Sequence, residues 1–133
     1  MSLVIPTVGK NKIMSLAFNK TAQADLVLHL YANNLTPTIG TVLTDLTEAS
    51  GGGYSSVTLG GTSWTISSTA PVVASHIQTT FSFANAIGDI YGYFITVGGT
   101  DLLWVEKFTN GPYNISSASD KVRFTPSITF GDN

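Results

Sequence analysis

The chain has 133 residues and a formal net charge of −2, and only 11% of its residues are charged, against about 25% in an average soluble domain. It has no cysteine, which excludes disulfides, cysteine-ligated zinc, iron–sulfur clusters and thiol nucleophiles. Six basic residues are too few for the electrostatic footprint of a nucleic-acid-binding protein. The 18 Thr and 14 Ser are typical of a β-rich coat or adhesion protein, part of whose weakly charged surface is covered in an assembly.

The length fits one domain, which we place at residues 1–133. No run approaches the roughly 20 apolar residues of a membrane-spanning helix. The start of the chain lacks the basic stretch that precedes the apolar core of a secretory signal. We therefore expect a soluble product, made inside the cell, that does not associate with membranes.

The first 25 residues predict an extended arm and a short helix. Residues 1–9 form an apolar arm, in which Pro6 biases Ile5 away from helical dihedral angles. From 10 to 24 the spacing of the apolar residues indicates a helix. The residues on its apolar face are Ile13, Leu16, Ala17 and Ala24.

The remainder, residues 25–133, is predicted to consist of strands and turns. Leu26, Leu28 and Leu30 alternate with other residues, as in a strand with one face in the core. Gly60-Gly61 and Gly98-Gly99 each separate two such runs and indicate hairpins. The expected strands are 26–31, 43–49, 54–59, 63–66, 75–83, 90–97, 102–108 and 121–130.

About eight strands at this spacing predict an all-β fold, an antiparallel sandwich of jelly-roll type with a short N-terminal helix and arm. Within the 75–83 strand, alternation places four residues on one face: Ile77, Thr79, Phe81 and Phe83. In the 90–97 strand it places Tyr91 and Tyr93 on one face, with a gap at Gly92 on the other. Packing in the core or at an interface is favoured for these tyrosines over ligand binding.

The two histidines limit the metal chemistry of the chain. Because His29 and His76 are the only ones, a three-histidine zinc site is impossible. A site that combines both with Asp45 or Glu48 remains open, although a hydrogen-bonded strand histidine is favoured for each. No Gly-x-Ser-x-Gly elbow occurs, so a serine triad has no support. We therefore predict no catalytic residue, no metal site and no cofactor.

Glu106 is the carboxylate that lies within a strand-like run, on the same face as Trp104. We favour an ion pair with Arg123 or Lys121 over catalysis. Gly51–Gly53 is followed by a strand and not by a helix, so a flexible turn is favoured over a phosphate-binding loop. The other acidic residues near turns are expected to cap the backbone: Asp25, Asp45, Asp89, Asp101 and Asp120.

The order of several short sequence motifs along the chain resembles that of a known group of proteins. The motifs are Val8-Gly9-Lys10, Leu28-His29-Leu30-Tyr31, Glu48-Ala49-Ser50-Gly51-Gly52-Gly53-Tyr54, Trp64, Tyr91-Gly92-Tyr93-Phe94, Leu102-Leu103-Trp104-Val105-Glu106, Gly111-Pro112 and Pro126-Ser127-Ile128-Thr129-Phe130. With these motifs, nearly the whole chain resembles small virion structural proteins of tailed bacteriophages, notably those of cyanobacteria.

The resemblance implies a head decoration (cement) protein on the capsid surface of the virion, synthesised in the host cytoplasm. Its partners would be the lattice of the major capsid protein and further copies of itself, as a homotrimer or a dimer. A tail or fibre component, or a carbohydrate-binding module that recognises a host glycan, is the alternative. The apolar arm, with Leu3, Val4, Ile5 and Pro6, is the candidate interface. An ordinary first strand tucked into the sandwich explains the same residues equally well.

Overall fold

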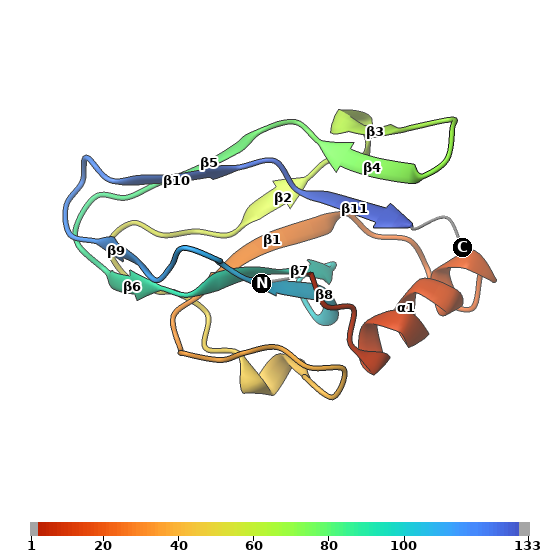
Figure 1. Ribbon diagram of the computed structural model, residues 1–133, viewed down its shortest axis with the longest axis horizontal. Coiled ribbons are helices and arrows are strands. Elements are labelled where there is room, and N and C mark those ends of the chain that lie inside the picture. Colours follow the sequence, from red (N-terminus) through yellow and green to blue (C-terminus); the bar gives the residue numbers. More distant parts are fainter. Residues whose placement is uncertain (1–2, 131–133) are drawn as a thin grey trace.

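The computed structural model describes residues 3–130, which form an antiparallel β protein with one α-helix, α1 (Thr7–Ala17) (Figure 1). The predicted all-β fold is confirmed. The described residues contain eleven strands in four hydrogen-bonded sheets, and not about eight. The strands are β1 (Leu26–Tyr31), β2 (Val57–Leu59), β3 (Trp64–Ile66), β4 (Val72–His76), β5 (Thr79–Ser82), β6 (Gly88–Ile90), β7 (Gly92–Val97), β8 (Asp101–Lys107), β9 (Tyr113–Ile115), β10 (Lys121–Phe124) and β11 (Ser127–Phe130).

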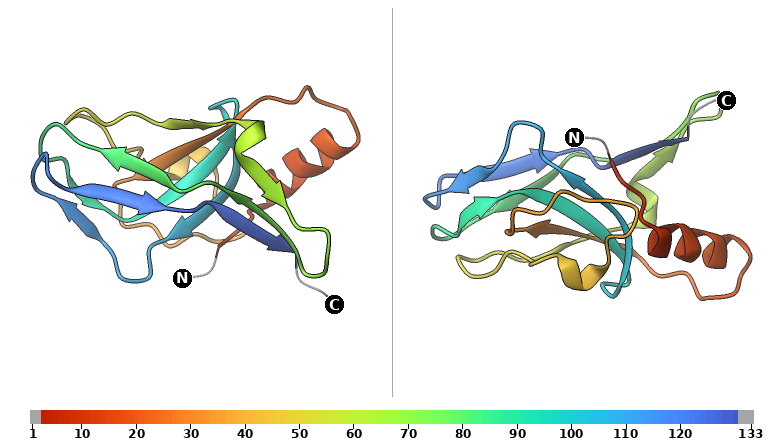
Figure 2. Two further views of the ribbon diagram at one scale, coloured as in Figure 1. Left: turned by 90° about the horizontal axis from the view of Figure 1, so that it is seen from above. Right: turned by 60° about the horizontal axis from the view of Figure 1, so that its bottom comes forward.

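Residues 72–130 form one long hairpin that is folded over on itself. Residues 72–90 run antiparallel to 113–130, through the pairs β4–β11, β5–β10 and β6–β9. The hairpin continues into β7 and β8 and closes at the turn Gly98–Thr100. It bends near residues 83–87 and 116–120, so that β4, β5, β10 and β11 form a second layer above β7 and β8 (Figures 1 and 2).

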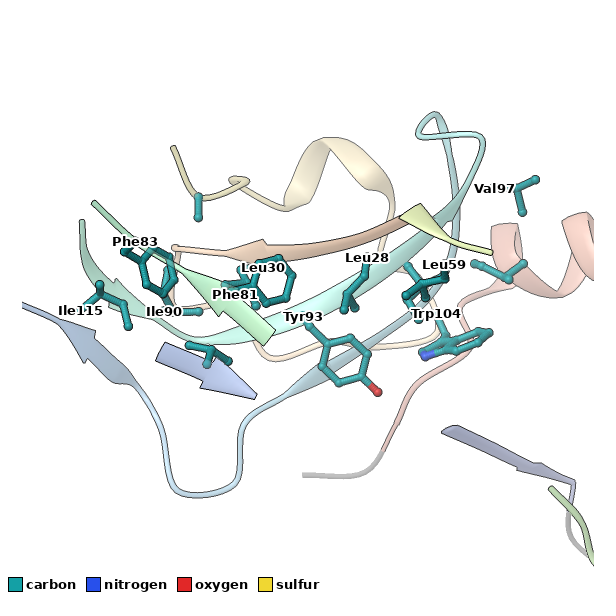
Figure 3. Packing of buried hydrophobic residues seen from close by; sticks show 14 residues of the cluster. Leu28, Leu30, Leu59, Phe81, Phe83, Ile90, Tyr93, Val97, Trp104 and Ile115 are labelled. Carbon is teal, nitrogen blue, oxygen red and sulfur yellow. The ribbon is translucent and has the colours of Figure 1, made fainter. Parts of the chain in front are cut away.

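The central sheet has the strand order β2-β1-β7-β8, and both of its faces are covered. The face toward the second layer, here called the core face, carries the main core, which includes Ile95. Leu28 and Leu30 of this core are labelled in Figure 3. The opposite face, here the connector face, is covered by residues 32–50, here the connector. Because β7 lies in the middle of this arrangement, all six of its residues are buried.

On the connector face, the smaller core joins side chains of the sheet to the connector. Tyr31, Phe94, Leu102 and Val105 are buried there, against leucines of the connector. The hydroxyl of Tyr31 donates to the carbonyl of Leu35 at 3.1 Å. The prediction that strand 26–31 has a single buried face is therefore wrong, because the irregular connector buries the other face as well.

The helix is displaced from its predicted position. It spans Thr7–Ala17 and not 10–24, and it packs along β8. Gly9 permits this contact, since a Cβ atom there would lie 1.9 Å from the carbonyl oxygen of Leu103. Ala24, expected on the apolar face of the helix, lies instead in the extended segment before β1.

The predicted arm, residues 1–9, is extended only up to Pro6, and its first two residues lie outside the described part of the chain. Val4 exchanges two backbone hydrogen bonds with Val105, at 2.8 and 3.0 Å, on the outer edge of β8. Leu3 and Ile5 pack against the main core, and Pro6 is fully buried. The arm thus acts as a short edge strand within its own chain.

An extra residue explains why the predicted strand 75–83 is divided. Thr79 lies opposite Phe124, whereas Ser75 lies opposite Ser127, so the first chain has one residue more between these pairs. Such a bulge reverses the alternation of side chains. Ile77 is therefore 63% exposed, and not on the buried face. The other three residues predicted on that face, Thr79, Phe81 and Phe83, are buried.

Two further strand predictions are wrong. Gly60-Gly61 does not close a hairpin, because β2 pairs with β1 in the central sheet while β3 pairs with β4 in the second layer. Residues 43–49 contain a 3₁₀ turn, Leu43–Asp45, and an isolated bridge between Glu48 and Tyr31. The hairpin at Gly98-Gly99 is confirmed.

Tyr91 and Tyr93 lie on opposite faces of the central sheet, and not on one. Tyr93 belongs to the main core, whereas Tyr91, which precedes β7, packs in the smaller core of the connector face. The gap at Gly92 is filled by the ring of Tyr31, which would lie 2.6 Å from a Cβ atom at this position. Both tyrosines are therefore packing residues.

Candidate functional site

Four side chains form a hydrogen-bonded cluster, which we call the His29 cluster. His29, Glu48 and Thr96 lie on the connector face, and the fourth member, Tyr54, has its ring packed against the main core. His29 Nδ1 lies 2.8 Å from Glu48 Oε2, and His29 Nε2 lies 2.9 Å from Thr96 Oγ1. The Tyr54 hydroxyl donates to the same Glu48 oxygen at 2.9 Å and accepts the backbone N–H of Leu30 at 3.0 Å. A neutral imidazole protonated on Nδ1 satisfies both of its neighbours.

Each member of the cluster is placed by a different element. His29 lies on β1 opposite Phe94 of β7, and the two rings stack at 4.5 Å. Glu48 lies on the connector, at the bridge to Tyr31. Tyr54 follows the turn at Gly51–Gly53, whose three glycines all have positive φ. The turn predicted for these glycines is confirmed.

The cluster has the order carboxylate–imidazole–hydroxyl of a hydrolase triad, but its hydroxyl is inaccessible. Thr96 is 0% exposed and His29 is 6% exposed, so no substrate can reach Oγ1 in this structure. Burial raises the pKa of Tyr54 above its ordinary value, and its hydrogen bond to Glu48 raises it further. The cluster fixes the connector to the sheet and satisfies polar groups that the connector buries.

The metal site that combines both histidines does not form. His76 lies on β4, where its ring meets Trp64 edge-on at 5.2 Å. Asp45 accepts the backbone N–H of Val42 at 2.9 Å. Within residues 3–130, no three His, Asp or Glu side chains are grouped so that they could hold a metal ion.

Glu106 has a different partner from the one predicted. It accepts a hydrogen bond of 2.8 Å from the Tyr93 hydroxyl, and not an ion pair from Arg123 or Lys121. Burial raises the pKa of Tyr93, and the negative charge of Glu106 raises it further. The indole nitrogen of Trp104 faces the same hydroxyl and has a smaller, opposing effect on the pKa of Tyr93 (Figure 3).

Two of the five acidic residues near turns, Asp45 and Asp120, cap the backbone as predicted. Asp120 accepts the backbone N–H groups of Ser116 and Ser117 at 2.7 and 3.2 Å, and the bonds from Ser116 lower its pKa. Asp45 caps a turn in the same way. Asp101 instead pairs with Lys12 at 2.9 Å, and Asp89 accepts from the Asn114 amide at 2.8 Å.

An apolar cavity of about 300 Å³ opens at the end of the sandwich beside the segment that joins α1 to β1. We call it the mouth cavity. Leu26, Leu59 and Trp104 of the central sheet line one side. The other side of the cavity is lined by second-layer residues: Trp64, Ile66, Ala74 and Ile128. The remaining lining residues include two polar ones, Gln23 and Asp25. Trp104 is 3% exposed, so Trp64 is the indole that a ligand could meet.

A second apolar surface lies where the connector meets the start of α1. Val8, Ile39 and Val42 are all exposed, and we call them the arm-side patch. Val8 and Val42 line one shallow cavity, and the backbone N–H of Thr7 donates to the carbonyl of Ile39 at 2.8 Å. The patch therefore adjoins the arm residues Leu3–Pro6.

No protein-family model, no curated protein and no solved structure matches the chain. Within the described residues, no helix is long and apolar enough to cross a bilayer.

Proposed function

We propose that the protein is a non-catalytic bacteriophage head decoration (cement) protein, which binds the assembled capsid shell and stabilises it. The long folded hairpin supports the finer description of the fold as jelly-roll-like. A protein that binds the assembled shell and not the free subunits adds its binding free energy to shell stability. Many copies on one shell multiply the effect of each weak contact.

The observation that carries this proposal is the arm-side patch. Val8, Ile39 and Val42 are exposed at 42%, 68% and 38%, although none of them is needed for the two cores. Adjacent exposed apolar residues mark contact surfaces. This patch, with the half-buried arm residues Leu3, Val4 and Ile5 beside it, is the proposed contact with the lattice of the major capsid protein. Pro6, the fourth predicted interface residue, is fully buried and supports the arm from beneath.

Co-sedimentation with purified phage heads that lack the protein tests the proposal. We expect saturable binding to heads, no binding to unassembled capsid subunits, and a higher temperature for the opening of the heads. Ile39→Asp should weaken head binding about tenfold or more. Ile77→Asp is the matched control, because Ile77 is 63% exposed and lies on the bulge of the second layer. Failure to bind heads, or equal effects of the two variants, would contradict the proposal.

The proposed partners are thus the capsid lattice and further copies of the chain, as a homotrimer with the dimer as alternative. The proposed location is the outer surface of the virion. Neither nucleic acid nor a membrane is a proposed partner, and no cofactor is proposed.

The mouth cavity favours a second candidate function, glycan recognition by a tail or fibre component. Trp64 offers an indole face, and Gln23 and Asp25 offer polar groups of the kind that bind sugar hydroxyls. Titration with host surface polysaccharide should then quench the tryptophan fluorescence saturably, and Trp64→Ala should abolish the quenching. Unchanged fluorescence at millimolar sugar would remove this candidate.

A further inference from the structure

The sheet β11-β4-β3 projects beyond the end of the central sheet, above α1 (Figures 1 and 2). Its register identifies the residues that share a face: Ile66 lies opposite Ala74, Ala74 opposite Ile128, and Val72 opposite Phe130. Because Ile66, Ala74 and Ile128 line the mouth cavity, this is the inner face of the sheet, which continues the sandwich core outward.

The outer part of this inner face is apolar and uncovered. Ile66, Val72 and Phe130 are exposed at 68%, 42% and 59%. Ile66 and Phe130 follow Thr65 and Thr129 on their strands, and Val72 lies opposite Phe130 on the same face, so the three form one patch, which we call the overhang patch. Exposed apolar groups gathered on one sheet face mark a surface that another molecule covers.

The charge of the surroundings indicates what covers it. No Asp, Glu, Lys or Arg occurs in residues 49–88 or 124–130, which contain the whole β11-β4-β3 sheet. A partner with a charged face would have to desolvate its charges against this sheet, which itself offers no opposite charge to pair with them. An apolar, uncharged face complements another of its own kind, and a second copy of the chain presents one. Identical copies meet here without charge repulsion.

We infer that the overhang patch is a self-association surface, covered by a second copy of the chain. The inference rests on the self-association included in the proposed function and names its surface, which is different from the arm-side patch proposed to bind the capsid. It requires only that Ile66, Val72 and Phe130 of neighbouring copies pack together. The same contact would close the mouth cavities of the associated copies.

Light scattering on a sizing column, over a wide range of loading concentrations, tests this inference. At high loading concentration the wild type should have a mass of at least twice 14.0 kDa, and this mass should fall toward that of the monomer on dilution. Ile66→Asp should elute as a monomer at all concentrations, while the equally accessible control Ile77→Asp should keep the wild-type mass. A monomeric wild type, or an Ile66→Asp variant of unchanged mass, would overturn the inference.

A mixing experiment separates a lost contact from a damaged fold. Ile66→Asp and Ile66→Lys should each be monomeric when pure, and should associate when mixed, because opposite charges then meet across the contact. Failure of the mixture to associate would overturn a direct contact between these faces. The result is independent of head binding, which reports on the arm-side patch.

Discussion

The two faces of the central sheet are buried by different means. On the core face, Leu28 and Leu30 meet the regular strands of the second layer, and the contact is apolar. On the connector face, His29, from the same strand, meets an irregular segment through hydrogen bonds to Glu48 and Thr96. An irregular covering segment brings polar groups with it, and these must find partners when buried. The stability contributed by the core face should therefore depend on the volume of its side chains. The stability contributed by the connector face should depend on whether its buried polar groups keep their hydrogen-bond partners.

The largest expected effect is on the core face. Leu30 is 0% exposed, so Leu30→Ala removes buried methyl groups and leaves a cavity that the two layers cannot close. We expect the free energy of unfolding to fall by about 2–5 kcal/mol, measured by urea denaturation at pH 7. Leu30→Met, which roughly conserves the volume, should cost less than about 1.5 kcal/mol. Equal losses for the two variants would show that volume is not what this face requires.

On the connector face, Thr96→Val should be costly although it keeps the shape of the side chain. Removal of the hydroxyl leaves the buried Nε2 of His29 without its 2.9 Å partner, and we expect a loss of about 1–3 kcal/mol. Thr79→Val is the matched control, since Thr79 is also buried but makes only a 3.4 Å contact with the carbonyl of Ile77. If both variants lose the same free energy, the His29 cluster does not stabilise the connector face.

The same contrast explains how far the sequence predicts the fold. Regular alternation predicted the strands at 26–31, 90–97 and 102–108, because those residues pack against other regular elements. The connector has no period, so nothing in its sequence predicts that it covers Tyr31 and Phe94. The bulge at Ile77 has no local sequence signal either, since it depends on the spacing of the partner strands β10 and β11.

The candidate sites divide in the same way. The capping roles of Asp45 and Asp120 depend on neighbours in the chain, and were predicted. The partners of Glu106 and His29 come from other strands, so the sequence gives residue types without pairings. Thr96 was not predicted as a hydrogen-bonding residue, because in the sequence a threonine within a strand cannot be distinguished from any other β-branched strand residue. The overhang patch could not be predicted either, because only the register of β3, β4 and β11 shows that its three residues share a face.

The core face also contains a polar contact, the hydrogen bond from the Tyr93 hydroxyl to Glu106. Its contribution to stability can be separated from that of the apolar packing by raising the pH. The pKa of Tyr93 is raised above its ordinary value of about 10, so the folded state keeps a proton that the unfolded chain releases. The part of the free energy of unfolding that comes from this raised pKa is fully present below about pH 10, and it is lost as the pH rises above that value.

Tyr93→Phe removes this pH dependence. We expect a loss of about 1 kcal/mol at pH 7, since Glu106 loses its donor. The difference from the wild type should narrow between pH 9 and pH 11, measured by urea denaturation at each pH. A constant difference would mean that Tyr93 titrates normally in the folded protein.

The smallest expected effect concerns a lysine at the rim of the connector face. Lys107 Nζ donates to Asn34 Oδ1 at 2.7 Å, and it lies 6.0 Å from the centre of the Tyr91 ring. Both contacts are near solvent, where such interactions contribute about 0.5–1 kcal/mol. Lys107→Ala should therefore cost less than about 1 kcal/mol, whereas Lys121→Ala, whose Nζ makes only an exposed 3.4 Å contact with Ser82, should cost nothing measurable. If Lys107→Ala cost as much as Thr96→Val, the connector would be held at its rim as firmly as at the His29 cluster, and the polar burial beneath it would not be what fixes this face.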